Sequence, residues 1–267
     1  MRKGVCYVCV PGDTVDARLR AAREAGYHGI ELTFAQPGGG PLAYDAGPDD
    51  VRGLRARIEA AALEAPSVMC GAALAGASLL DPDPGVRARG VAHLATGLRR
   101  AAWLGADTVL IHPGQLGADT GYDEAFDGLV SALRALVPAC EAASVGVAVE
   151  NVWNRFLVSP RDMGQLVDAV GHPLVGAYFD VGNCVLWSHA AQWVRALGPR
   201  IRRVHVKDFQ RRIGTGAGFC QLLDGDADYP AVMAALRAAG YDGYLTSEVS
   251  GDIAETSRRL NRILAMA

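Results

Sequence analysis

The sequence predicts an α/β protein with the (β/α)8 TIM-barrel fold, built as a single domain over residues 1–267. Eight short apolar runs recur along the 267 residues, and a segment of helical periodicity follows each of them. The runs are continuously apolar, which is typical of strands buried on both faces of a parallel sheet. A barrel of this kind takes roughly 250 residues. An open doubly wound sheet is the alternative, but the loop Val10–Asp13 lacks the G-x-G-x-x-G fingerprint of that fold.

The predicted strands are bounded by Gly, Pro or Asp, the residues that most often interrupt regular structure. In chain order, the strands are Gly4–Val10, Gly29–Phe34, Pro66–Cys70, Thr108–His112, Gly146–Glu150, Val175–Asp180, Arg202–Val206 and Tyr244–Val249.

The predicted helices carry apolar residues at the spacing of one helical face. In the first helix Val15, Leu19 and Ala22 share a face, and Gly26 ends it. Ser159, followed by proline, marks the start of the fifth helix. The other helices are Pro48–Leu63, Val86–Leu104, Tyr122–Ala143, Ala190–Leu197, Tyr229–Ala239 and Asp252–Leu264, after a first helix at Asp13–Ala25.

The composition argues against several classes of protein. Lys and Arg number 26 against 29 Asp and Glu, a net charge of −3, so no general field attracts nucleic acid or anionic lipid. Residues 1–10 show no signal peptide, and no stretch reaches the roughly 18 apolar residues of a membrane span. The 6 cysteines are scattered, which predicts a reducing, cytoplasmic location. Cys6 and Cys9 match C-x-x-C, but we interpret them as core-strand residues rather than a redox pair.

Polar side chains close several of the predicted strands. The carboxyl ends of barrel strands meet at one face, where barrel enzymes place their chemistry. A charge buried there is costly unless it is paired or binds a metal. Three acids and one histidine close four consecutive strands: Glu150, Asp180, His205 and Glu248. This oxygen-rich set suits Mn²⁺, Mg²⁺ or Co²⁺ with positions left open for substrate. The alternative is a ring of salt bridges with Lys207 or Arg203.

Several segments resemble motifs of the xylose-isomerase-like sugar isomerases and epimerases. Residues 150–156 are similar to the strand-five motif of that family, Tyr178–Asn183 to its strand-six motif, and Val204–Asp208 to its strand-seven motif. Residues 223–226, 240–243 and 247–249 match the close of its barrel. The family includes D-tagatose and D-psicose 3-epimerases, L-ribulose-5-phosphate 3-epimerases and hydroxypyruvate isomerases, and more distantly the endonuclease IV type. The resemblance covers essentially the whole chain.

The resemblance implies a divalent-metal-dependent isomerase or epimerase acting on a ketose, ketose phosphate or related polyol ketone. Glu150, Asp180, His205 and Glu248 would hold one metal ion, most often Mn²⁺, with Mg²⁺, Co²⁺ or Zn²⁺ as alternatives. Glu150 and Glu248 would double as the acid/base pair that moves a proton through a metal-stabilised enediolate. Returning the proton to the same carbon gives a 3-epimerase, and returning it to the neighbouring carbon gives an aldose–ketose isomerase.

Other activities remain open at this point. A lyase on an oxidised C-glycoside would begin with the same proton abstraction. A nuclease of the endonuclease IV type is disfavoured by the net charge and by Asn183, which stands where that type needs a histidine. A non-catalytic sugar-binding barrel is a further alternative. The expected partners are a small sugar or sugar phosphate, without nucleic acid or membrane. The resemblance also suggests a homodimer or homotetramer.

Further residues are predicted to contact the substrate: Glu31, His112, Trp153, Asn183, Lys207 and Arg211. Some of them have alternative roles. His112 could instead bind metal or be structural, Lys207 could pair with Asp208, and Glu31 could pair with an arginine. Trp153 would form an apolar wall of the sugar site or part of a lid.

Overall fold

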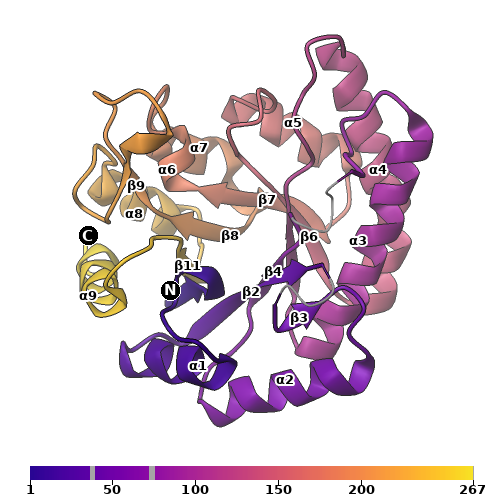
Figure 1. Cartoon of the computed structure of the whole chain (residues 1–267). Helices are drawn as coiled ribbons and strands as arrows, with labels where there is room; N and C mark the ends of the chain where they lie inside the picture. Colours follow the sequence, from indigo (N-terminus) through magenta and orange to yellow (C-terminus); the bar gives the residue numbers. More distant parts are fainter. Residues whose placement is uncertain (37–39, 72–75, 267) are drawn as a thin grey trace.

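The computed structural model of the chain describes residues 1–36, 40–71 and 76–266. Within these ranges, eight parallel strands form a barrel with the helices around its outside (Figure 1). β1 pairs with both β2 and β11, so the sheet closes on itself. The barrel strands are β1 (Arg2–Cys6), β2 (Gly29–Ala35), β4 (Ser67–Met69), β5 (Thr108–Ile111), β6 (Gly146–Glu150), β7 (Val175–Asp180), β8 (Ile201–Val206) and β11 (Tyr244–Ser247). The predicted (β/α)8 fold is confirmed.

The helices follow the strands in the predicted alternation. Thr14, Asp83 and Ser159 each accept a hydrogen bond from a backbone N–H of the first turn of α1, α3 and α5, and so fix where these helices begin. The helices are α1 (Val15–Glu24), α2 (Pro48–Ala60), α3 (Pro84–Leu104), α4 (Tyr122–Ala143), α5 (Pro160–Val170), α6 (Val181–Cys184), α7 (Ala190–Leu197), α8 (Tyr229–Ala238) and α9 (Ile253–Leu264). Within the described part of the chain, no helix is both long and apolar enough to cross a membrane.

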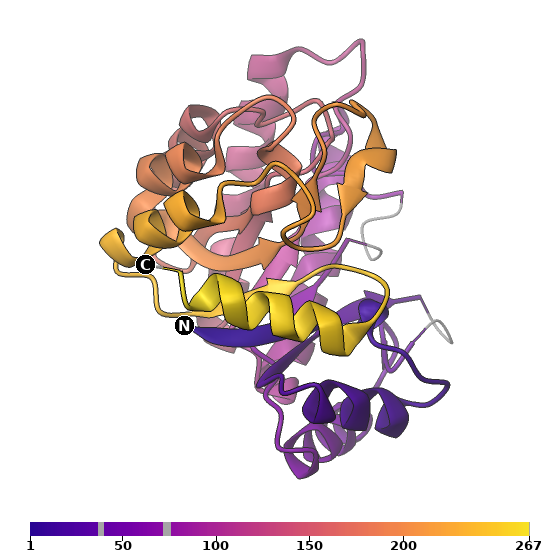
Figure 2. The same cartoon turned by 90° about the vertical axis from the view of Figure 1, so that its left-hand side faces the viewer.

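The first and last elements lie against each other. Figure 2 shows α9 in front of β1, close to the N-terminus. The buried Lys3 of β1 donates a hydrogen bond from Nζ to Ser257 Oγ of α9 (2.7 Å). Leu260 and Ile263 of α9 are also buried, so the helix covers the seam where the barrel closes.

Apolar residues form two separate layers. A large core lies between strands and helices and includes Val109, Val149 and Phe179. A smaller cluster of Leu110 and Tyr178, with Ala148 and Met69, comes from the alternate strand positions and lies inside the barrel. The interior is therefore filled below the carboxyl ends of the strands, where the predicted site lies.

Some element boundaries differ from the prediction. The strand predicted at Gly4–Val10 ends at Cys6, and Tyr7–Cys9 form a 3₁₀ helix closed by a hydrogen bond from Val10 N–H to the Tyr7 carbonyl. Cys6 and Cys9 are free. Two short strands, β9 (Asp208–Phe209) and β10 (Phe219–Cys220), form a hairpin-like sheet that the sequence did not predict. The short β3 (Leu42–Ala43) beside β2 was also not predicted.

Candidate metal centre and active site

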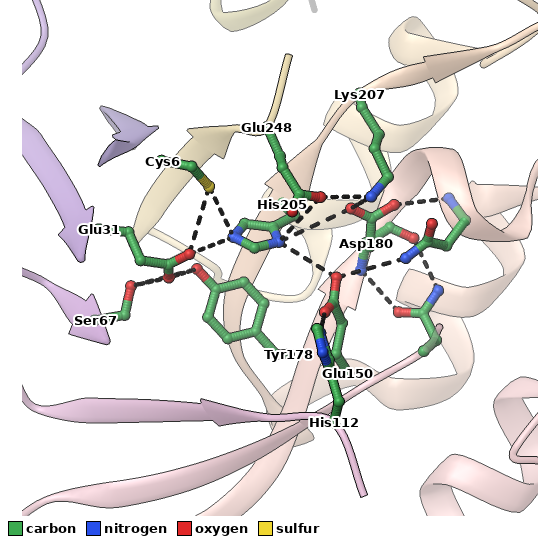
Figure 3. Close-up of polar contacts among 12 residues, drawn as sticks. Cys6, Glu31, Ser67, His112, Glu150, Tyr178, Asp180, His205, Lys207 and Glu248 are labelled. Carbon is green, nitrogen blue, oxygen red and sulfur yellow. Dashed lines mark hydrogen bonds and ion pairs between the residues drawn. The ribbon is translucent and has the colours of Figure 1, made fainter. Parts of the chain in front are cut away.

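Four side chains converge at the carboxyl ends of β6, β7, β8 and β11. Glu150 and Asp180 are the last residues of β6 and β7, and the strand register places Asp180 beside His205 of β8. Glu248 follows β11 directly. One ligand atom from each of these side chains lies within 4.8 Å of the others (Figure 3). Three of the four side chains are buried, whereas that of Glu248 is 25% exposed, so the cluster opens towards solvent on the Glu248 side.

The two ring nitrogens of His205 face different partners. Nδ1 faces the acidic cluster, 3.3 Å from Glu150 Oε1 and 3.9 Å from both Asp180 Oδ2 and Glu248 Oε2. Nε2 faces Glu31 Oε1 at 2.7 Å on the opposite side. A proton on Nε2, donated to Glu31, leaves the Nδ1 lone pair free for a metal.

Glu31 belongs to the support of His205. Its carboxylate is buried and accepts hydrogen bonds from the hydroxyls of Tyr178 (2.6 Å) and Ser67. The alternative pairing of Glu31 with an arginine is wrong. The Glu31 side chain lies on the side of His205 opposite to Glu150 and Asp180, and not at an open surface (Figure 3). Burial raises the pKa of Glu31, but His205, Ser67 and Tyr178 outweigh it and lower the pKa. Glu31 is therefore an anion held against the imidazole.

The buried carboxylate of Asp180 tests whether the cluster suits a cation. Its Oδ1 accepts a hydrogen bond from the Asn183 N–H (2.7 Å), whereas its buried Oδ2 has no hydrogen-bond partner among the described residues. Lys207 Nζ lies 3.3 Å from Oδ2 as an ion pair without hydrogen-bond geometry. Burial, together with Glu150 and Glu248, raises the pKa of Asp180 to about 7. A buried oxygen without a partner, beside two more carboxylates and an imidazole nitrogen, fits a divalent metal.

In the structure, the positive charge next to the acidic cluster is the ammonium group of Lys207. Its ammonium lies 2.5 Å from Glu248 Oε2 and 3.3 Å from Asp180 Oδ2, which matches part of the salt-bridge alternative. Arg203 takes no part in it, because it pairs with Asp107. Burial lowers the pKa of Lys207, but the surrounding acids outweigh burial and raise it, so the side chain is charged.

The alternative pairing of Lys207 with Asp208 is wrong. The carboxylate of Asp208 instead accepts hydrogen bonds from the backbone N–H groups of Phe209, Leu223 and Ala227. It organises the loop after β8 rather than the site.

Three polar side chains hold Glu150 and Asp180 in place. Asn151, which was not among the predicted site residues, donates to the Asp180 carbonyl (2.9 Å) and accepts from the Asp180 N–H (2.7 Å). Its position directly after Glu150 was the available signal. His112 Nε2 contacts Glu150 Oε2, and Asn183 Nδ2 lies 3.5 Å from Glu150 Oε1. Burial raises the pKa of Glu150, but the hydrogen bonds and charges of His112 and His205 outweigh it and lower the pKa.

Of the two remaining predicted substrate contacts, Trp153 lies beside the centre and Arg211 does not. Trp153 is partly exposed beside the centre and donates its indole N–H to the Asn183 carbonyl (2.8 Å). Arg211 is not brought to the four acid and histidine side chains. Its Nε donates to the Val185 carbonyl (2.7 Å), and it lines a separate pocket of about 230 Å³ with Asp226. The prediction of Arg211 as a substrate contact is therefore not supported by its position.

A pocket of about 400 Å³ adjoins the centre. Its lining includes Glu248, Lys207, Phe219, Gln221 and Ser250. Its volume lies in the range of small-molecule sites, roughly 300–1,000 Å³. The exposed edge of the acidic cluster therefore faces a space that a small ligand can fill.

Comparison with known proteins places the chain in a family. Residues 19–264 match the model of the xylose isomerase-like TIM barrel. The chain belongs to this family. Among curated proteins, 117 residues are 27% identical to 3-oxo-isoapionate decarboxylase of Pectobacterium atrosepticum. That match spans 42% of this chain and 42% of the relative's own length.

Several solved structures share the fold over nearly the whole chain. A D-tagatose 3-epimerase-like protein has a TM-score of 0.83 at 20% identity, over 99% of this chain and 97% of its own. The 3-keto-D-glucoside 4-epimerase YcjR of E. coli has a TM-score of 0.80 at 16% identity, over 98% of each chain. The zinc-bound IOLI protein has a TM-score of 0.81 at 15% identity, over 99% and 98%. At these identities the likeness shows the fold alone.

Proposed function

We propose that this protein is a divalent-metal-dependent sugar isomerase or epimerase acting on a ketose, ketose phosphate or related polyol ketone. The observation that carries the proposal is the convergence of Glu150, Asp180, His205 and Glu248 beside an open pocket. When bound there, a divalent ion would polarise a ketone and stabilise negative charge on its oxygen. Mn²⁺ is our first choice, because three carboxylates and one imidazole form a hard ligand set. The zinc-bound IOLI neighbour keeps Zn²⁺ among the alternatives.

Glu150 and Glu248 are the proposed acid/base pair. Each is a carboxylate of the cluster, and they come from β6 and from the residue after β11. One removes the proton from the carbon beside the carbonyl, and the other returns a proton to that carbon or to its neighbour. Glu248 borders the pocket, and the ammonium group of Lys207 lies 2.5 Å from its Oε2. His112 and Asn183 hold Glu150 in position.

A lyase or decarboxylase is the second candidate, and one observation favours it. The partial match to 3-oxo-isoapionate decarboxylase shows that a related sequence breaks a carbon–carbon bond. Loss of CO₂ next to a ketone leaves the same kind of enolate that proton abstraction does, so the same residues could serve either reaction.

We also propose a substrate class, a cellular location and a set of partners for this reaction. The substrate is a small sugar, the enzyme acts in the cytoplasm as a single domain, and nucleic acid is not a partner. The net charge of −3 supports this last point. A homodimer or homotetramer, which the family resemblance suggests, remains a prediction.

Solvent exchange tests the proposal directly. The Mn²⁺-loaded protein is incubated in D₂O with ketoses, ketose phosphates and hydroxypyruvate, and deuterium incorporation is read by NMR. We expect exchange at the carbon beside the carbonyl of at least one compound, because proton abstraction precedes every product. Protein with Glu150→Gln is the control. If the metal is bound and no compound exchanges, the isomerase proposal is wrong and a decarboxylase becomes the better candidate.

A further inference from the structure

Four aromatic side chains form a cluster beside the candidate metal centre, here called the aromatic shelf: Trp153, Trp187, Phe209 and Phe219. Trp153 is its middle member. Its ring centroid lies 5.2 Å from Trp187, 5.3 Å from Phe209 and 5.1 Å from Phe219. These are the separations of aromatic rings in direct contact.

The shelf connects the reaction site with solvent. At its inner end, Lys207 Nζ lies 5.1 Å from the Phe219 ring centroid and 2.5 Å from Glu248 Oε2. Phe219 and Glu248 also line the same pocket of about 400 Å³. At its outer end, Trp187 is 48% exposed. One exposed tryptophan is ordinary on a protein surface, but this one continues a row of rings that begins beside Lys207, the ion-pair partner of the proposed acid/base residue Glu248.

The rings are held in place before any ligand binds. The indole N–H of Trp153 donates to the Asn183 carbonyl (2.8 Å), and Phe219 is held by its pairing with Phe209 between β10 and β9. Ser188, directly after Trp187, accepts a hydrogen bond from the indole of Trp193 (2.7 Å). The N–H of Trp153 is used internally, so this partly exposed side chain has no free hydrogen-bond donor for a ligand and can contact one only through its ring.

We propose that the aromatic shelf is a subsite for a second ring of the substrate. The substrate would be a ketose joined to another ring that has an apolar face, and that face would stack on Trp187 and Trp153. The inference rests on the proposed function for the placement of the ketose at the metal centre. It deepens that function by naming a glycoside-like substrate rather than a free monosaccharide. An aryl ring and a second sugar ring share this chemistry, and the experiment separates them.

The test compares three ketose probes on the full-length, Mn²⁺-loaded protein by calorimetry: 4-O-methyl-D-fructose, 4-O-phenyl-D-fructose and lactulose, which carries a galactose ring on the same oxygen. We expect 4-O-phenyl-D-fructose, lactulose or both to bind about 10-fold more tightly than 4-O-methyl-D-fructose, since one stacked ring contributes on this order. Preference for the phenyl compound assigns an aryl ring, and preference for lactulose assigns a sugar ring.

Trp187→Ala should remove the preference, whereas Val8→Ala should keep it. Val8 is the control because it is 59% exposed and outside the shelf. Equal affinities for the three probes, or a preference that survives Trp187→Ala, would overturn the proposal. If deuterium exchange occurs but no ring preference exists, the shelf inference fails and the proposed function stands. If the preference exists but no ketone exchanges, the proposed function fails and the ring subsite stands.

Discussion

The Glu31 carboxylate lies behind His205 and fixes which imidazole nitrogen faces the acidic cluster. Burial acts to lower the pKa of His205, but Tyr178, Glu31 and Cys6 outweigh it and hold the pKa well above its usual value. The raised pKa favours the protonated imidazole. A divalent ion would be bound by Nδ1 in its deprotonated form, while Nε2–H would donate to Glu31, so Glu31 would support the metal site without lining the pocket.

Glu31→Gln should weaken Mn²⁺ binding about 10- to 100-fold, because the amide removes the negative charge that orients His205. Isothermal titration calorimetry with MnCl₂ gives the affinity. Glu64→Gln is a matched control, since Glu64 is exposed and pairs with Arg2 away from the cluster. An Mn²⁺ affinity equal to that of wild type would remove Glu31 from the support of the centre.

Glu248→Gln and Glu150→Gln should each lower kcat about 10²- to 10⁴-fold on the substrate found by deuterium exchange, because each removes one of the two proton carriers. The metal content of both variants is measured alongside, so that loss of metal is separated from loss of proton transfer. Near wild-type turnover in either variant would show that its residue is not part of the acid/base pair.

At the scale of elements, the loop after β8 is held in shape by hydrogen bonds between its own residues. The carboxylate of Asp208 accepts hydrogen bonds from three backbone N–H groups, the most distant of them 19 residues further along the chain. Gly225 fits beside it because a Cβ at that position would lie 2.2 Å from Asp208 Oδ1. The same loop carries Phe219 to the pocket, so its internal hydrogen bonds help to shape the proposed substrate site.

Asp208→Asn should destabilise the protein by about 1–3 kcal/mol, because an amide group would face at least one buried N–H donor in place of an acceptor. Urea unfolding followed by circular dichroism measures the loss. Asp13→Asn, at an exposed position, is the control. Unfolding midpoints that coincide for the two variants would show that the loop does not depend on this carboxylate.

At the scale of the whole molecule, the barrel contains a buried carboxyl group, that of Asp180, whose ionisation is disfavoured by burial. Burial raises the pKa of Asp180 to about 7 from 3.8, against the attraction of Lys207. Between about pH 4 and about pH 7 the folded chain thus keeps a proton that the unfolded chain has released. Because the folded state binds more protons in this window, the contribution of Asp180 to stability falls as the pH rises through it.

Asp180→Asn should remove this pH dependence, since the amide does not titrate. Thermal unfolding in EDTA from pH 4.5 to 8 tests it. Wild type should lose stability relative to the variant as the pH rises to about 7, and the difference should then stay constant. Parallel curves over the whole range would mean that Asp180 ionises normally in the folded protein.

The barrel was predictable because strand and helix patterns are local. Tyr122–Ala143 forms a helix with the predicted bounds, and Gly146–Glu150 a strand with the predicted bounds. The boundary after Cys6 was not predictable, because Tyr7 and Val8 are apolar and fit a strand by pattern alone. A strand ends where its neighbours stop pairing, and the pairing of β1 with β2 stops at Cys6.

The sequence by itself determined the fold class and the four side chains that close β6, β7, β8 and the turn after β11, because parallel barrel strands end on one face. Only the tertiary structure decided which way each side chain faces. It placed Glu31 behind His205, turned Arg211 to the Val185 carbonyl, and put Lys207 between Asp180 and Glu248. These contacts join residues from different strands and loops, and their geometry depends on the packing of the closed barrel rather than on any local pattern.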